Sequence, residues 1–257
     1  MPKRQGCYNS AMSLPNADIR SVADLFLSTI EPLIARIEEE DAEQEDQQHV
    51  QLLMDAFYQL VDVCQRCEHD PAPEDGQAAI DVTELGEYGM NLLMRFAYLS
   101  SRHGLEQTSR RIERLSFAFA LWIVRHGGEV KVLEPVVNGI ALLANELTEH
   151  ADLRTLYQQV GEIKSQIVME IQQDLEQADP QRPWRVLLLN HAIIATRTHQ
   201  PRLMREAFAT LVERLPTDAP EFFREGMVQM DALDYPDHVR VVVEEFHRLV
   251  NARKLLH

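Results

Sequence analysis

Apolar residues recur every three or four positions along almost the whole chain, and alternation with a period of two is essentially absent. That spacing places the apolar side chains on one face of an α-helix and argues against a strand-based fold. Only 10 of the 257 residues are glycine, about half of ordinary usage, so tight hairpin turns have few places to form. The sequence therefore predicts an all-α protein with about ten helices.

Prolines, glycines and capping residues set the expected helix ends. Asn16 is the predicted N-cap of the first helix, and Pro32 is expected to kink that helix because proline removes a backbone donor. Asp81 with Glu84 is the predicted capping box of the third helix. The predicted helices cover residues 17–40, 46–68, 81–103, 106–126, 130–149, 152–178, 184–198, 201–215, 219–232 and 236–254.

Breaks in this pattern divide the chain into three regions. Residues 1–15 are expected to be a disordered tail, and Met12 is an alternative start because nothing before it resembles a foldable segment. Residues 16–180 are expected to hold long helical hairpins, which either continue one array or form a separate bundle. Residues 181–257 hold four shorter helices.

The four helices of 181–257 repeat with a shift of 35 residues. The shift places Pro201 on Pro236, and it aligns the apolar residues of both helix pairs. A unit of this length cannot bury its apolar face alone, so such units stack side by side. The aligned sets are Met204, Ala207, Phe208, Leu211 and Leu215 with Val239, Val242, Val243, Phe246 and Val250, and Leu187, Leu188, Ala192 and Ala195 with Phe222, Phe223, Met227 and Met230.

In unit length and apolar spacing, this C-terminal region resembles the tetratricopeptide family of helical-hairpin repeats. Trp184 and Pro216 suggest the family's signature of Trp, Leu-Gly, Tyr, Ala, Phe and Pro, which is otherwise not reproduced. The resemblance implies an α-solenoid, an antiparallel array of helical hairpins. It also implies a concave groove, lined by the first helix of each hairpin, that holds a peptide or a partner helix.

The chain is acidic, with a formal net charge of −16. Residues 1–81 hold 5 basic and 17 acidic residues, so this third carries most of the negative charge. An acidic surface repels phosphate backbones, so nucleic acid is not an expected partner. The densest acidic run, residues 38–46, is expected to be a solvated linker or helix end, with an acidic docking patch as the alternative.

The sequence also predicts a soluble, cytoplasmic protein that does not enter a membrane. The richest apolar stretch, Val186 to Ala195, contains Asn190 and His191 and falls short of the roughly 18 apolar residues that a spanning helix needs. Lys3 and Arg4 are not followed by the apolar run of a signal peptide. Three cysteines, an odd number, indicate free thiols in a reducing compartment.

Asn190 and His191 are the first candidate binding residues, because they interrupt an otherwise apolar helix. Buried polar side chains need hydrogen-bond partners, so the pair is expected either to satisfy neighbouring backbone groups or to face a groove and bind a ligand. Trp184, Arg185 and Arg197 lie close in the sequence. Together they give an aromatic and basic set that suits an acidic or carboxylate-bearing peptide.

A second candidate binding set is Arg110, Arg111 and Arg114, the densest basic cluster in the chain. Spacings of three and four residues put Arg114 beside Arg111 or Arg110 on one helix face. These arginines are expected either to pair with acids such as Glu106 and Glu113, or to bind a phosphate or an acidic partner.

Two motifs match metal-binding patterns in part. Cys64 and Cys67 have the spacing of a zinc half-site, but zinc needs four ligands and a second cysteine pair is missing. Both cysteines are therefore expected to pack inside a helical core. Glu244 and His247 give one Glu-x-x-His motif, whereas a di-iron bundle needs two. No metal is expected.

Complete catalytic motifs are missing from the sequence. Arg-His-Gly occurs at 102–104 and 125–127 and is similar to the nucleophilic loop of histidine phosphatases, but each copy is expected to end a helix with a left-handed glycine. We expect a non-enzymatic interaction or adaptor module without a cofactor, whose partner is a protein or peptide. The alternative is a helical-bundle enzyme, or a small-ligand or metal-binding protein, with a polar pocket near Asn190 and His191.

Overall fold

The computed structural model describes residues 14–39, 44–69, 80–175 and 179–254. Every regular element in these ranges is a helix, which confirms the all-α prediction. Nearly all of the expected tail, Met12 and the middle of the acidic run lie outside the described residues. The helices are α1 (Ile19–Glu39), α2 (Gln44–His69), α3 (Val82–Arg102), α4 (Glu106–Arg125), α5 (Glu134–Glu146), α6 (His150–Ser165), α7 (Met169–Gln172), α8 (Pro183–Arg197), α9 (Pro201–Arg214), α10 (Ala219–Ala232) and α11 (Asp237–Lys254).

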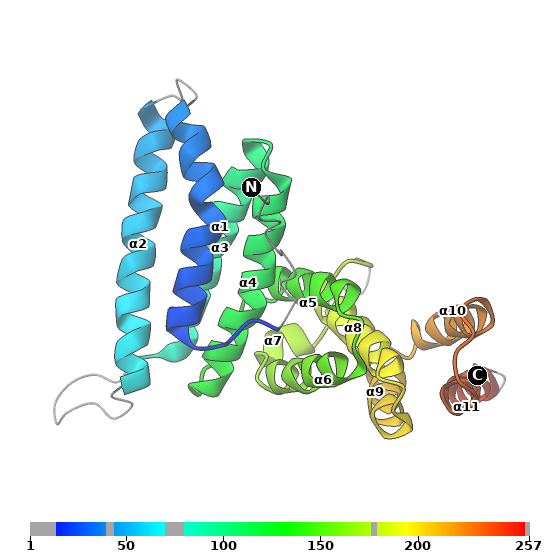
Figure 1. Cartoon of the computed structure of the whole chain (residues 1–257). Helices are drawn as coiled ribbons and strands as arrows, with labels where there is room; N and C mark the ends of the chain where they lie inside the picture. The colour runs from blue at the N-terminus through cyan, green and yellow to red at the C-terminus, as the bar shows by residue number, and fades with distance from the viewer. Residues whose placement is uncertain (1–13, 40–43, 70–79, 176–178, 255–257) are drawn as a thin grey trace, which may run out of the picture.

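Helices α1 to α4 form a four-helix bundle at one end of the molecule (Figure 1). Helix α1 packs against α2 and α4, and α3 packs against the same two helices. At the centre of the bundle, the ring of Phe26 stacks on Phe57 with a centroid distance of 3.7 Å. Glu68 then joins three helices, because its Oε1 accepts hydrogen bonds from the Ile19 backbone nitrogen and from Trp122 Nε1, both at 2.9 Å.

Helix α4 joins the bundle to the rest of the chain. It contacts α5 and α6 in addition to α1 and α3, and its residues 115–123 are all buried. The axes of α4 and α5 approach closely at Gly139, where an added Cβ would lie 2.4 Å from the backbone oxygen of Glu113. The sequence predicts only one buried stripe for this helix, whereas neighbours on several sides bury every residue from 115 to 123.

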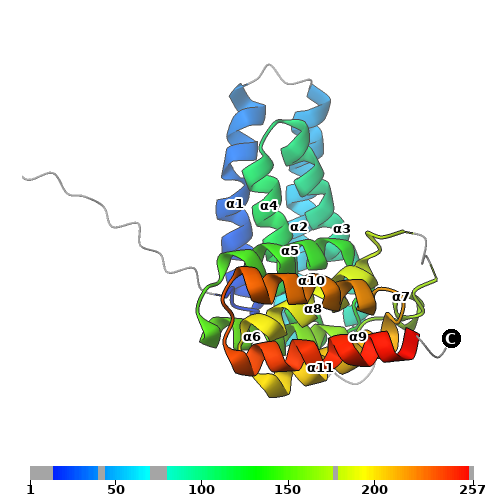
Figure 2. The ribbon, with the colours of Figure 1, turned by 90° about the vertical axis from the view of Figure 1, so that its right-hand side faces the viewer.

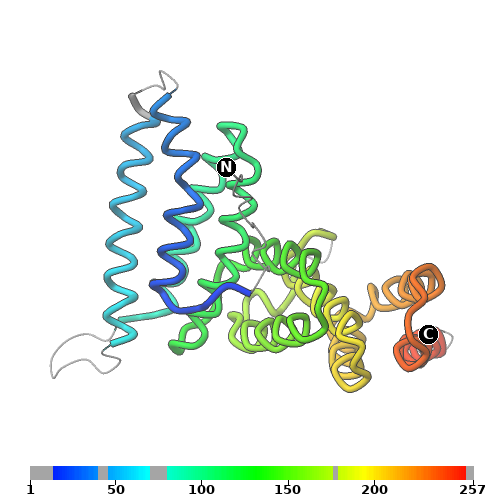
Figure 3. The backbone as a smooth tube through the Cα atoms, viewed as in Figure 1, coloured from blue at the N-terminus to red at the C-terminus, as the bar shows by residue number. Residues whose placement is uncertain are grey.

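The C-terminal part continues away from the bundle as successive helical pairs. Helix α8 packs against α5, α6 and α9, and α10 pairs with α11. The chain path runs from the bundle through α5, α6 and α8 to the last hairpin at the far end (Figure 3). Turned by 90°, the molecule shows α10 and α11 lying across its near side (Figure 2). Neighbouring helices are thus arrayed along the chain, as the sequence pattern predicts at this coarse level.

Several predicted helix ends are confirmed by local geometry. Asp81 caps α3 by accepting hydrogen bonds from the backbone nitrogens of Thr83 and Glu84. Gly104 and Gly127 have positive φ angles of 73° and 81°, the left-handed conformation that ends a helix without steric cost. In a full capping box, the Glu84 side chain would also bond back to the backbone nitrogen of Asp81. Here the Glu84 carboxylate pairs instead with Lys131.

The start of α1 differs from expectation in detail. Asp18, not Asn16, provides the capping oxygen, since its Oδ1 accepts from the Ser21 backbone nitrogen at 2.8 Å. Hydrogen bonds from the Ser21 side chain and then from its backbone nitrogen lower the pKa of the Asp18 carboxyl. Pro32 lies inside α1, which continues to Glu39.

The predicted helices 130–149 and 152–178 are both too long. Helix α5 begins only at Glu134, and α6 ends at Ser165. The reason is tertiary: Val130 and Ile167 form a parallel bridge in which the Val130 nitrogen donates to the Gln166 oxygen at 2.8 Å. Residues that would extend both helices are therefore held in extended backbone, and the short helix α7 follows.

Candidate functional site

A cleft of about 530 Å³ lies among α5, α8 and α10, and we call it the C-terminal cleft. Its apolar lining includes two phenylalanines, Met230 and Val243, and also Ile193 and Leu233, which are exposed. The polar lining comes from all three helices. The lining residues are Ala141, Ala144, Asn145, Asn190, Ile193, Thr196, Arg197, Phe208, Phe222, Glu225, Gly226, Gln229, Met230, Leu233, Tyr235 and Val243.

The cleft exists because the last two hairpins meet along one side only. Their second helices, α9 and α11, pack against each other, whereas the first helices, α8 and α10, make less contact. The space between α8 and α10 is therefore left open above a base of residues from α9 and α11, among them Phe208 and Val243. Helix α5 closes the cleft on the side of the bundle.

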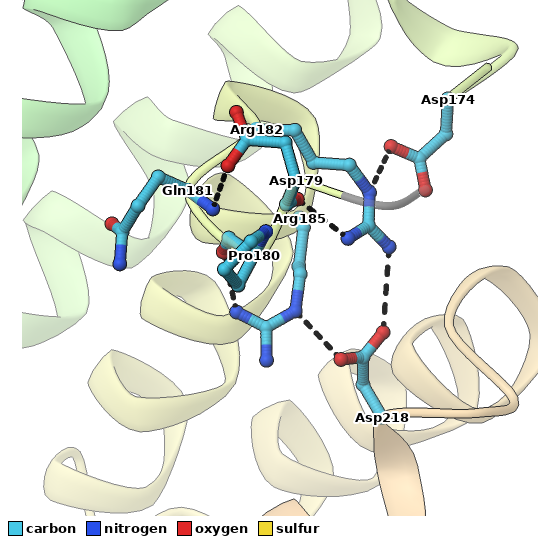
Figure 4. A network of polar contacts seen from close by, with 7 residues as sticks. All are labelled: Asp174, Asp179, Pro180, Gln181, Arg182, Arg185 and Asp218. Atoms are coloured by element: carbon cyan, nitrogen blue, oxygen red, sulfur yellow. Dashed lines mark hydrogen bonds and ion pairs between the residues drawn. The ribbon is translucent and has the colours of Figure 1, made fainter. Parts of the chain in front are cut away.

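An ion-pair network ties the beginnings of α8 and α10 together (Figure 4). Arg185 Nε donates to Asp218 Oδ1 at 2.6 Å, and Arg182 Nη2 lies 3.4 Å from Asp218 Oδ2. Arg182 also donates from Nε to Asp174 Oδ1 at 2.6 Å, and this hydrogen bond raises the pKa of its guanidinium. Arg185 is thus engaged within the protein, where it joins the beginnings of the two helices that border the cleft.

Asn190 borders the C-terminal cleft, which is one of the two positions that the sequence leaves open for it. The residue is half-buried, and its Nδ2 is buried with no hydrogen-bond partner among the described residues. Leaving an amide donor unpaired in the protein costs about 1–3 kcal/mol.

His191 points to the other side of α8 and lies against α6. Its ring stacks on Tyr157 with a centroid distance of 4.2 Å, and its Nε2 donates to the Tyr157 backbone oxygen at 3.2 Å. Since Nε2 carries the hydrogen, Nδ1 is left as the acceptor for Lys164 Nζ, 3.4 Å away. Burial, with the nearby Lys164 charge, lowers the pKa of His191 to about 3, so the ring is neutral.

Lys164 and Tyr157 complete this buried polar group. Burial lowers the pKa of the Lys164 ammonium, while nearby Glu206 opposes the shift. Burial raises the pKa of the Tyr157 hydroxyl to about 12. Asn190 and His191, adjacent in the sequence, therefore serve different surroundings, because neighbouring residues of a helix point about 100° apart.

Arg197 and Trp184 complete the first predicted set. Arg197 lines the cleft, but its guanidinium donates to the backbone oxygens of Ala144 and Leu147, where it satisfies carbonyls at the end of α5. Trp184 is buried in the core and does not line the cleft. Of the first set, the structure thus brings Asn190 and Arg197 to the cleft.

The second predicted set lies on α4, away from the C-terminal cleft. Arg110 and Arg111 are exposed there. Arg114 Nη1 pairs with Glu146 Oε2 at 2.8 Å and so joins α4 to α5. The acid expected as its neighbour, Glu113, instead accepts a hydrogen bond from Asn138 Nδ2 at 3.0 Å.

The two partial metal-binding motifs of the sequence, the cysteine pair and the Glu-x-x-His motif, are engaged in packing and pairing within the fold. Cys64 and Cys67 are free thiols buried in α2, and burial raises the pKa of both. Glu244 pairs with Arg248 on the same helix. Within the ranges that the structure describes, no group of three or more His, Cys, Asp or Glu side chains could hold a metal ion.

Sequence reasoning missed the contributions of α5 and α10 to the cleft. Asn145, Glu225 and Gln229 line it, yet each lies on an exposed helix face that resembles any solvated surface. A usable signal was Ile193, an apolar residue outside the aligned buried positions of α8, with 43% of its surface exposed.

Comparisons with known proteins leave the function to the structure alone. The chain matches no protein-family model, no curated protein and no solved structure. Among the described helices, none combines the length and the apolar character needed to cross a membrane.

Proposed function

We propose that this protein is a non-enzymatic interaction module that binds a peptide or a partner helix in the C-terminal cleft. The observation that carries the proposal is the cleft itself, which opens between the first helices of the last two hairpins. Exposed Ile193 and Leu233 beside an apolar base favour a partner with apolar side chains.

The repeat-like burial of the last four helices supports this proposal. The four aligned apolar residues of α9, Leu215 directly after it, and their five counterparts in α11 are all buried. In the first helices of the two hairpins, Leu187 is buried, and its counterpart Phe222 is partly buried. We propose that the hairpins are tetratricopeptide-like units, and that their first helices form the binding face for which such arrays are suited.

The polar lining of the cleft suits the backbone of a bound segment. Asn145, Asn190 and Gln229 present carboxamides from three different helices, and a carboxamide both donates and accepts hydrogen bonds. Peptide backbone carries the same two kinds of group. A segment lying in the cleft can thus place apolar side chains on its base while its backbone meets these amides.

The competing function is a small-ligand site. Of the predicted pair, Asn190 and His191, only Asn190 lies where it could contact such a ligand. His191 faces α6, where its two ring nitrogens are already occupied. The proposal also places the protein in the cytoplasm, since Cys64 and Cys67 are unpaired thiols.

A matched pair of substitutions tests the proposed function. Ile193→Glu puts a carboxylate in the C-terminal cleft, and Val241→Glu makes the same kind of change on α11 outside it, with 43% and 53% of the two residues exposed. Peptides selected from a random display library on the full chain are then titrated against each variant by calorimetry. We expect Ile193→Glu to weaken binding about tenfold or more, which corresponds to about 1.4 kcal/mol, and Val241→Glu to leave it unchanged.

Two results would contradict the proposal. One is that peptides bind both variants as well as they bind the unaltered chain. The other is a stoichiometric small molecule, seen by native mass spectrometry, that Ile193→Glu displaces while no peptide is selected. Circular dichroism of both variants serves as the control for folding.

A further inference from the structure

A second apolar surface lies on the bundle, along the groove between α2 and α3. We call it the α2–α3 groove, a hollow of about 840 Å³. Leu52 on α2 and Tyr98 on α3 both line it, and each has 68% of its surface exposed. Tyr88, nearer the beginning of α3, adds a second exposed aromatic side chain to the groove. Neighbouring large apolar side chains at such exposure mark an interaction site more often than an ordinary surface.

The shape of the groove fits a helix. Helices α2 and α3 are consecutive and lie side by side in the bundle, as Figures 1 and 2 show. On α2 the lining residues are spaced at three, four and seven positions from His49, so they form one straight face of that helix. Two such parallel faces leave a groove, and the row of side chains on a third helix fits such a groove.

The charge of the groove selects the kind of helix. Its polar lining consists of His49, Asn91 and Arg95, and none of its lining residues carries a carboxylate. Arg95 is exposed and forms no ion pair with the described residues, whereas Arg102, two turns further along α3, pairs with Asp46 at 3.3 Å. A carboxylate-free strip with an available guanidinium stands out in a chain whose net charge is −16.

We infer that the α2–α3 groove docks an amphipathic helix of a partner protein, with an apolar face on Leu52, Tyr88 and Tyr98 and a carboxylate paired with Arg95. This surface is separate from the C-terminal cleft, because α2 and α10 lie at opposite ends of the molecule (Figure 1). Two separate docking surfaces allow the protein to hold two partners at once, which raises the effective concentration of one partner near the other.

The test uses the full chain and a display library of amphipathic helices on a stable helical scaffold. Selected helices are titrated against the unaltered chain, Leu52→Glu, Arg95→Glu and the control Tyr58→Glu, which alters an exposed α2 residue outside the groove. We expect Leu52→Glu to reduce affinity about tenfold or more and Tyr58→Glu to leave it unchanged. Arg95→Glu should weaken the binding of helices that carry a carboxylate. Changing that carboxylate to lysine in the helix should restore affinity for the Arg95→Glu variant.

The remaining outcomes overturn the inference. Selection of no helix, or of helices that bind Leu52→Glu as well as the unaltered chain, removes the groove as a docking site. A dimer in light scattering that Leu52→Glu dissociates shows that a second copy covers the groove instead. Ile193→Glu, in the C-terminal cleft, should leave helix binding unchanged, so the two surfaces are tested separately.

Discussion

Lowering the pH from 7 to 5 will test the buried position of His191 between α8 and α6. In the folded protein this ring is neutral, since burial and the Lys164 charge lower its pKa from 6.5 to about 3. In the unfolded chain the ring binds a proton below pH 6.5. The unfolded state therefore binds more protons than the folded state between these two values, and stability falls as the pH falls through this window.

The size of the effect follows from the same two pKa values. A pH of 5 is about 1.5 units below the pKa of the ring in the unfolded chain, so the unfolded ring is protonated while the folded ring stays neutral. The free energy of unfolding is therefore about 2 kcal/mol lower at pH 5 than at pH 7. The full shift is reached only near pH 3, where other groups titrate as well. A measurement between pH 7 and 5 isolates the histidine better, because most carboxylates stay ionised there.

Urea unfolding at pH 7 and 5, followed by circular dichroism, measures this loss in the unaltered chain and in His191→Gln. Glutamine is uncharged at both values, so its variant should lose about 2 kcal/mol less between them. His199, whose pKa burial also lowers, contributes equally to both proteins and cancels in the comparison. Equal losses in the two proteins would refute the assignment of His191 as a neutral, buried group.

Three further predictions concern stability. Gly139→Ala should destabilise the fold by about 1–3 kcal/mol, since its Cβ would meet the Glu113 backbone; Gly161→Ala, in open space on α6, should stabilise it by about 0.5–1 kcal/mol. Both are read from thermal unfolding, and equal shifts would contradict the close approach of α4 and α5. Glu68→Ala should cost about 1–3 kcal/mol in urea unfolding, because it leaves two donors without an acceptor. Asp218→Ala should cost a similar amount and weaken peptide binding in the C-terminal cleft; unchanged affinity would show that the network does not set the cleft.

Most of the helices could be predicted because their signals are local. The aligned stripe of α9 and α11 is buried at every position, and Asp81, Gly104 and Gly127 end their helices as predicted. Apolar spacing and capping depend on residues within one or two turns, so they are visible in the sequence. The all-α class and the order of the longer helices follow from these signals alone, whereas the short helix α7 does not.

The candidate sites depend on partners that the sequence does not place. Arg185 meets Asp218, 33 residues away, and Arg197 meets carbonyls about 50 residues away, so both serve the fold. Only packing decides that Asn190 borders the cleft while His191, the next residue, faces α6. By itself the sequence determined where most of the helices lie and which of their faces become apolar, through local spacing, but not where α5 begins or α6 ends. The tertiary structure decided how far apart α8 and α10 stand, because the crossing of two hairpins depends on side chains distant in the sequence.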